Sequence, residues 1–185
     1  MAEPARKFLF VMASARQNGN SEILARRAAE EISEKGEQTW VRLRDVNLPP
    51  FEDLRHTEGG IYRMPIGQQR VLLDATLAAT DLVFVAPVYW FGLPASAKLF
   101  LDHWSGWMRV DGVNFKSRMA GKTMWAISAY AGASSQVADP LLGTLRLCCD
   151  YLRMRWGGEV LGCGSAPGDV LKDSLALANA ARLFG

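Results

Sequence analysis

One segment, residues 8–29, constrains the fold of this chain more than any other. It opens with the apolar run FLFVM, which has the length of a strand and is typical of one buried on both faces of a parallel sheet. After a polar loop, Leu24, Ala28 and Ile32 recur every fourth residue and predict a helix with one face on that sheet. The loop therefore joins the carboxyl end of a strand to the amino end of a helix, where free N–H groups and the helix dipole attract an anion.

The loop carries side chains that suit a phosphate group. Hydroxyls, amides and a guanidinium all donate to phosphate oxygens, and the candidates are Ser14, Arg16, Asn18, Asn20 and Ser21. Gly19 permits a sharp turn, and Asn20 or Ser21 can cap the helix. An ordinary strand–helix turn with a good cap explains the same residues, so the loop alone leaves both interpretations open. The density of polar groups and the arginine favour phosphate.

Glycine spacing excludes two other phosphate-binding motifs. A dinucleotide fingerprint needs G-x-G-x-x-G after the first strand, and Gly19 is the only glycine there. A Walker loop needs G-x-x-x-x-G-K-[ST] before a helix. Residues 121–123 have that ending, but Lys116 stands in place of the first glycine and a strand-like run, MWAI, follows. What remains is a monophosphate site, such as flavin mononucleotide (FMN) requires.

Length and composition are those of one globular domain, which we expect to span residues 1–185. A net charge of +2 gives no electrostatic argument for binding nucleic acid or an acidic membrane. No apolar run approaches the ~18 residues of a membrane span, and the run after Arg6 and Lys7 is interpreted as a strand rather than a signal peptide. The three cysteines form no metal or disulfide pattern and are predicted to be reduced core residues of a cytoplasmic protein.

A second unusual loop follows the apolar run at 81–86, which predicts another fully buried strand. Bulky side chains crowd this loop, whose candidate site residues are Pro87, Val88, Tyr89, Trp90, Phe91 and Gly92. The aromatic side chains either cover the edge of a core or a subunit interface, or form a flat wall for a planar ring with backbone amides at its polar edge. Taken alone, this loop favours the first interpretation.

The rest of the chain alternates strands with helices. Strands are expected over 38–46, 122–128 and 158–163, and the segments 47–65 and 107–120 are expected to be irregular. After the strand at 122–128, small residues let the backbone approach a ligand closely, and the candidates there are Ser128, Ala129, Tyr130 and Gly132. The alternation predicts a three-layer α/β sandwich with a five-stranded parallel sheet. The strand order 2-1-3-4-5 would bring the loops after the first, third and fourth strands together.

These residues resemble the NADPH-dependent FMN reductase family of the flavodoxin-like superfamily. The loop at 14–21 is similar to that family's FMN phosphate loop, and the segment 87–102 is similar to its isoalloxazine loop and following helix. The resemblance implies a flavodoxin-like fold, FMN bound by the candidate residues named above, and a homodimer or homotetramer with the flavin near the interface. Iron–sulfur flavoproteins of this superfamily carry a cysteine cluster after the second strand. The segment 48–60 has no cysteine, so no metal site is expected.

The resemblance also implies an activity. NADPH or NADH would reduce bound FMN, and a small-molecule acceptor such as a quinone, azo compound, nitro compound, metal ion or free flavin would take the electrons. No catalytic side chain is expected, because the cofactor carries the chemistry, and His56 and His103 are interpreted as a loop residue and a helix residue. Two alternatives stay open. One is a flavodoxin-type electron carrier without NAD(P)H turnover, and the other is an interaction module that has lost flavin.

Overall fold

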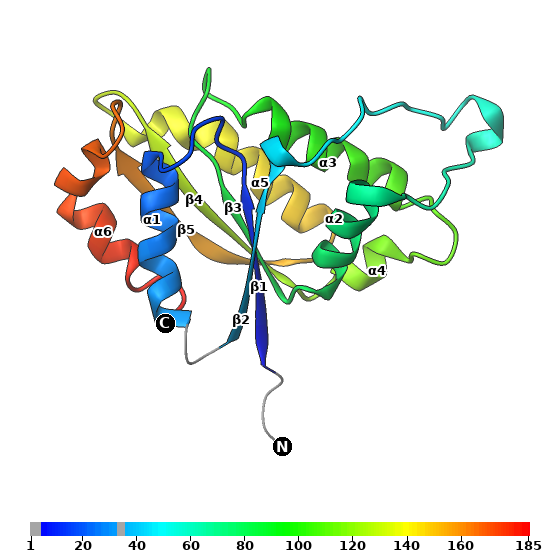
Figure 1. Ribbon diagram of the computed structural model, residues 1–185, viewed down its shortest axis with the longest axis horizontal. Coiled ribbons are helices and arrows are strands. Elements are labelled where there is room, and N and C mark those ends of the chain that lie inside the picture. The colour runs from blue at the N-terminus through cyan, green and yellow to red at the C-terminus, as the bar shows by residue number, and fades with distance from the viewer. Residues whose placement is uncertain (1–4, 33–35) are drawn as a thin grey trace.

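A five-stranded parallel sheet runs through the middle of the molecule in the order β2-β1-β3-β4-β5 (Figure 1). The computed structural model describes residues 5–32 and 36–185. The strands are β1 (Arg6–Met12), β2 (Gly36–Arg42), β3 (Asp81–Val85), β4 (Thr123–Tyr130) and β5 (Arg155–Cys163). The predicted fold class and strand order are therefore confirmed.

Helices cover both faces of the sheet (Figure 1). One face carries α1 (Asn20–Ala29) and α6 (Ser174–Ala180), whereas the other carries α2 (Gly67–Ala78), α3 (Ala95–Trp107), α4 (Phe115–Met119) and α5 (Asp139–Tyr151). Short 3-10 turns are η1 (Glu30–Ile32), η2 (Leu43–Asp45), η3 (Glu58–Gly60), η4 (Ser135–Ala138) and η5 (Asp169–Lys172). Within the described ranges, no helix combines the length and the apolar character that crossing a membrane requires.

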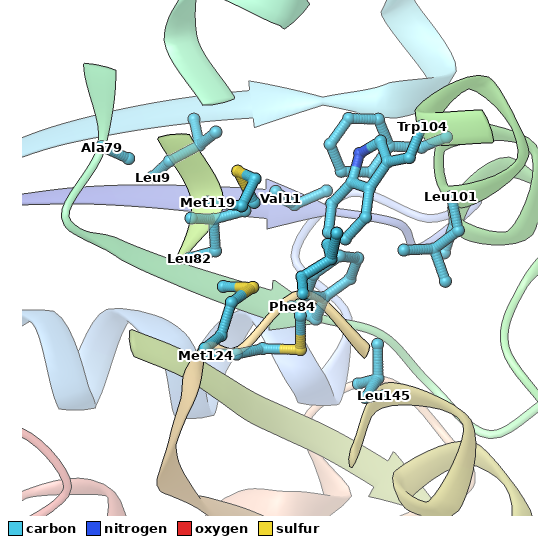
Figure 2. Packing of buried hydrophobic residues seen from close by; sticks show 14 of the residues in the cluster. Leu9, Val11, Ala79, Leu82, Phe84, Leu101, Trp104, Met119, Met124 and Leu145 are labelled. Carbon is cyan, nitrogen blue, oxygen red and sulfur yellow. The ribbon is translucent and has the colours of Figure 1, made fainter. Parts of the chain in front are cut away.

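Alternation along the central strands divides the core into two layers. Phe8 and Phe10 of β1 pack towards α1 and α6, whereas Leu9 and Val11 point to the opposite layer. Figure 2 shows that second layer, in which side chains from β1 and β3 meet Trp104 of α3. Because both faces of β1 are covered, its sequence is a nearly continuous apolar run.

Some boundaries differ from those expected from the sequence. β2 ends at Arg42 rather than at residue 46, because η2 follows and buries Leu43 in the core. β4 is longer than expected: Ser128 pairs with Leu161 of β5, and the pairing continues to Tyr130. The segment 107–120 was expected to be irregular but contains α4.

The prediction that all cysteines are core residues is wrong for one of them. Cys149 is buried in α5, and burial raises the pKa of its thiol to about 11. Cys148 is half-buried, whereas Cys163 is exposed at the end of β5. Cys163 is the last residue of β5, an edge strand with a neighbouring strand on one side only.

A β-bulge in the edge strand β5 makes room for the side chain of Trp125 on the neighbouring strand, β4. Met124 pairs with Trp156 and Trp125 pairs with Gly158, so Gly157 is an extra residue in β5. A Cβ atom on Gly157 would lie 2.5 Å from the indole ring of Trp125. That indole is fixed, because its Nε1–H donates to the buried carboxylate of Asp81 at 2.9 Å. The absence of a side chain at residue 157 is therefore a packing requirement.

We predict that Gly157→Ala lowers the free energy of unfolding by about 1–3 kcal/mol, the range for overpacking a well-packed site. The matched control is Gly143→Ala in the interior of α5, where a Cβ would meet nothing within 4 Å. The control should raise stability by about 0.5–1 kcal/mol, because alanine favours the helix over glycine. Urea unfolding of the three proteins measures both changes, and an equal response of the two variants would contradict the packing argument.

Candidate functional site

The carboxyl ends of the strands surround a cavity of about 200 Å³. The three predicted loops and one further turn, between β5 and α6, form its walls. The residues that line it are Ser14, Arg16, Gly19, Asn20, Ser21, Pro87, Val88, Tyr89, Ala129, Tyr130, Ala131, Gly164, Ser165 and Pro167. Segments far apart in the sequence thus meet at one edge of the sheet, as the strand order predicts.

The loop between β1 and α1 is shaped by its own hydrogen bonds. Ser14 Oγ accepts the N–H of Arg16 at 3.1 Å, and Glu22 Oε2 accepts the N–H of Asn18 at 2.9 Å. Asn18 has a φ of 53°, a left-handed conformation that asparagine tolerates. The residue before the helix is Gly19, which has no side chain to cap it, so neither Asn20 nor Ser21 is the cap. The first N–H groups of α1 thus stay available to an anion at the cavity.

A buried carboxylate fixes this loop to the rest of the molecule. The side chain of Glu22 is 1 % exposed and pairs with Arg42 of β2 at 2.5 Å and with Arg26 at 2.7 Å. Burial alone would raise the pKa of Glu22, but the hydrogen bonds from Arg42, Arg26 and the N–H of Asn18 lower it to about 2. Two arginines balance this charge, so Glu22 does not oppose an anion nearby.

Arg16 is a cation at the cavity for which the described residues show no acidic partner. Arg16 lies on the cavity wall and is exposed. Its guanidinium forms no hydrogen bond or ion pair with the described residues. A second arginine lies next to it: Arg44 Nη1 donates to the carbonyl of Ala15 at 3.0 Å. A free guanidinium with five donors is suited to a phosphate group.

The loop after β3 contains a strained hairpin turn. Tyr89 and Gly92 exchange two backbone hydrogen bonds, of 3.0 and 3.2 Å. Trp90 and Phe91 between them have φ angles of 47° and 63°, in a turn whose central positions favour asparagine and glycine. Trp90 is 96 % exposed and Phe91 is 56 % exposed. Bulky residues are thus held in an unfavourable backbone conformation beside the cavity, without the compensation of burial.

The cavity separates the predicted residues into two groups. Its walls include nine of them: Ser14, Arg16, Asn20, Ser21, Pro87, Val88, Tyr89, Ala129 and Tyr130. Six others lie outside these walls: Asn18, Trp90, Phe91, Gly92, Ser128 and Gly132. Ser128 is fully buried, and its hydroxyl has no partner in the described structure. Gly132 lines an adjoining hollow with Cys163. The roles of all these residues in binding a cofactor stay predictions.

The turn between β5 and α6 was missed from the sequence. It contributes Gly164, Ser165 and Pro167 to the cavity. Asn20, the first residue of α1, reaches it: Asn20 Nδ2 donates to the carbonyl of Ala166 at 3.0 Å. The sequence did contain a signal for this turn. The residues GSAPG directly follow the strand expected at 158–163, and the carboxyl ends of all parallel strands lie at the same edge of the sheet.

A second cavity, of about 270 Å³, lies between the 47–65 segment and α3. His103, on its wall, bonds through Nδ1 to the Gln69 amide and through Nε2 to the carbonyl of Pro49, both at 2.9 Å. These contacts hold the long segment onto α3 and account for the histidine without catalysis. Residues 5–32 and 36–185 contain no cluster of three or more histidine, cysteine, aspartate or glutamate side chains that suits a metal ion.

Comparison with known proteins identifies the family. The model of the flavodoxin-like fold family called Flavodoxin_2 matches residues 6–182. The chain belongs to this family. It is also 32% identical over 180 residues to YwqN of Bacillus subtilis (strain 168), provisionally named an NAD(P)H-dependent FMN-containing oxidoreductase, with 96% of each chain covered. The resemblance stated from the sequence is thereby confirmed.

Solved structures agree with this assignment. The Trp repressor binding protein from Bacillus subtilis superposes with a TM-score of 0.76 at 26% identity, covering 96% of this chain and 97% of that one. An FMN-dependent NADH-azoreductase from Bacillus anthracis (strain Ames Ancestor), solved in complex with FMN, gives a TM-score of 0.64 at 15% identity, covering 97% of this chain and 100% of that one. At such low identity, the azoreductase shows the shared fold alone.

We predict that Glu22→Gln destabilises the protein by about 3 kcal/mol at pH 7, the low end for breaking a buried ion pair, because Arg42 is partly exposed. The pKa of Glu22 is about 2 in the folded chain against an ordinary 4.5, so its stabilisation is complete above pH 4.5. It is lost as the pH falls towards 2. Urea unfolding at pH 7 and pH 3 should therefore show the difference from wild type shrinking at pH 3.

The control for this experiment is Glu37→Gln. Glu37 pairs with Lys7 at the surface, at 3.5 Å, with a side chain that is 73% exposed. Exposed ion pairs contribute about 0–1 kcal/mol, so this variant should resemble wild type at both pH values. A Glu22→Gln effect that stays constant between pH 7 and pH 3 would refute the assignment of the charge.

We predict that replacing Trp90 by Asn and Phe91 by Gly stabilises the fold by about 1 kcal/mol. Left-handed backbone costs bulky residues about 1–2 kcal/mol each, and the partial burial of Phe91 offsets part of the gain. Thermal unfolding in the absence of flavin measures the change. The control, Trp90→Phe, keeps a bulky residue in the strained position and should leave the melting temperature unchanged. A lower melting temperature for the double variant would show that the aromatic side chains stabilise the turn.

Proposed function

We propose that this chain is an FMN-dependent NAD(P)H oxidoreductase. The observation that carries the proposal is a cavity at the carboxyl ends of β1 and β3, where the strand order changes direction. Arg16 and the amino end of α1, which no side chain caps, both lie at this cavity. The 32% identity to a Bacillus subtilis protein provisionally named an NAD(P)H-dependent FMN-containing oxidoreductase supports the same class over 96% of the chain. The donor set fits a single phosphate group.

The loop between β1 and α1 would hold the phosphate of FMN. Arg16 supplies the charge, and the hydroxyls of Ser14 and Ser21 together with the first N–H groups of α1 supply hydrogen bonds. A Cβ on Gly19 would make only an ordinary contact, 3.5 Å from Ser14 Oγ, so the glycine matters here because it has no side chain to cap the helix. The phosphate would thus sit over the amino end of α1.

The loop after β3 would orient the isoalloxazine ring. Within the described structure, the N–H groups of Val88, Tyr89 and Gly92 already donate to backbone carbonyls, whereas none is shown from Trp90 or Phe91. In the proposed complex, these two backbone N–H groups would face the polar edge of the ring. When bound, FMN supplies the redox chemistry, taking a hydride from NAD(P)H and passing electrons to an acceptor.

Three finer features belong to this proposal. The acceptor is a small molecule such as a quinone, azo compound, nitro compound, metal ion or free flavin. Either NADPH or NADH serves as the co-substrate. The chain works as a homodimer or homotetramer, which would cover Trp90 and Phe91; their exposure of 96 % and 56 % supports this assembly.

An absorption spectrum of the purified protein tests the proposal. The expected result is a set of flavin bands, present at purification or after FMN is added, that bleach when NADPH or NADH is supplied without oxygen. Bands that bleach with neither nucleotide would indicate an electron carrier instead. No bound flavin at any FMN concentration would overturn the proposal.

We predict that Arg16→Ala weakens FMN binding by about 1.5–3 kcal/mol, the range for a hydrogen bond to a charged group. Riboflavin, which lacks the phosphate, should bind the variant and the wild type equally. Fluorescence quenching of each flavin measures both constants. The control is Arg63→Ala, an exposed arginine on the wall of the other cavity. An unchanged FMN dissociation constant for Arg16→Ala would remove Arg16 from the site.

A further inference from the structure

The turn between β5 and α6, residues 164–170, is held in place on its own side of the cavity. Its first N–H, that of Gly164, donates to the carbonyl of Tyr130 at 2.8 Å. Asp169 closes the turn from within, because its Oδ2 accepts the N–H of Ala166 at 2.7 Å and that of Ser165 at 3.3 Å. These bonds hold the turn beside the end of β4. Ser165, a residue of the turn, lines the cavity.

Asn20 fixes the other side of this turn. Its Nδ2 donates to the carbonyl of Ala166 at 3.0 Å, and its Oδ1 accepts the N–H of Gly168 at 2.9 Å and that of Val170 at 3.4 Å. Asn20 lines the cavity but is only 8 % exposed, so its amide is largely withdrawn from water. A Cβ on Gly164 would lie 2.8 Å from Nδ2, which shows how closely the turn packs on this amide.

We propose that Asn20 is a positioning residue that holds the β5–α6 turn against the phosphate loop, and that the hydroxyl of Ser165 binds the FMN phosphate from this turn. This inference rests on the proposed function. Ser165 is exposed at the cavity, and its hydroxyl has no hydrogen bond in the described structure. The amide of Asn20 bonds three backbone groups of the turn, and in this proposal it acts on the phosphate by holding Ser165 in place.

Hydrogen exchange in the flavin-free protein tests the first half of the proposal. Asn20→Ala should speed amide exchange at Gly168 and Val170 by about 10-fold or more, since each loses its acceptor. Asn20→Asp keeps the acceptor oxygen and should restore protection at both amides. The control, Gln17→Ala, removes an exposed amide from the same loop and should change neither. Unchanged exchange in Asn20→Ala would overturn the positioning role. If that variant does not fold, Asn20→Ser replaces it, because serine cannot reach the turn.

A double-mutant cycle on FMN affinity tests the second half. Ser165→Ala and Asn20→Ala should each weaken FMN binding about 10-fold, and the double variant should be no weaker than the weaker single variant. Riboflavin binding should be unaffected by Ser165→Ala. Effects that multiply to about 100-fold would instead make Asn20 a direct phosphate ligand, and full FMN affinity in Ser165→Ala would remove Ser165. If wild type binds no FMN, the proposed function fails, while the exchange result still decides the role of Asn20.

Discussion

The buried carboxylate of Glu22 is the interaction on which the candidate site depends. It binds Arg42 at the end of β2, Arg26 on its own helix and the N–H of Asn18 in the phosphate loop. A single side chain therefore couples the edge of the sheet, the first helix and the loop conformation. A buried charge costs free energy unless its partners are complete, so removal of any one partner penalises the whole arrangement. These contacts form without a ligand, and preorganisation of this kind lowers the entropic cost of binding.

Periodicity in the sequence was sufficient for the fold, because a parallel sheet covered on both faces demands continuous apolar strands and amphipathic helices between them. Periodicity did not predict the ends of strands that are set by tertiary contacts. The end of β2 depends on Leu43 turning into the core, and the length of β4 depends on pairing with β5. The same limit explains the site. Short-range spacing predicted a candidate loop that lines the cavity, whereas the β5–α6 turn reaches the same cavity through contacts between Asn20 and residues nearly 150 positions away.

The aromatic turn shows a second kind of limit. The sequence indicated bulky side chains near a planar ligand, but the structure places Trp90 and Phe91 outside the cavity and puts their backbone in left-handed conformations. No propensity favours that choice, since Asn-Gly would build the same turn without strain. Strain of this kind persists where the surrounding structure imposes it and something else requires it. Among the described residues, the N–H groups of Trp90 and Phe91 show no hydrogen-bond partner and both rings are exposed, so a ligand or a second subunit would find these groups accessible.

The GKT sequence at 121–123 has a structural role at the opposite end of the sheet. Lys122 precedes β4 and lies at the amino end of the strands, where its Nζ donates to the carbonyls of Leu77 and Ala79 at the end of α2. Burial lowers the pKa of Lys122, and the carbonyls it meets are those that a helix end leaves unsatisfied. Asp81, at the same end, is held by Arg6 and Trp125. The charged groups at this end bond one another or backbone carbonyls, whereas the candidate phosphate donors line the cavity at the carboxyl end, where parallel sheets bind their ligands.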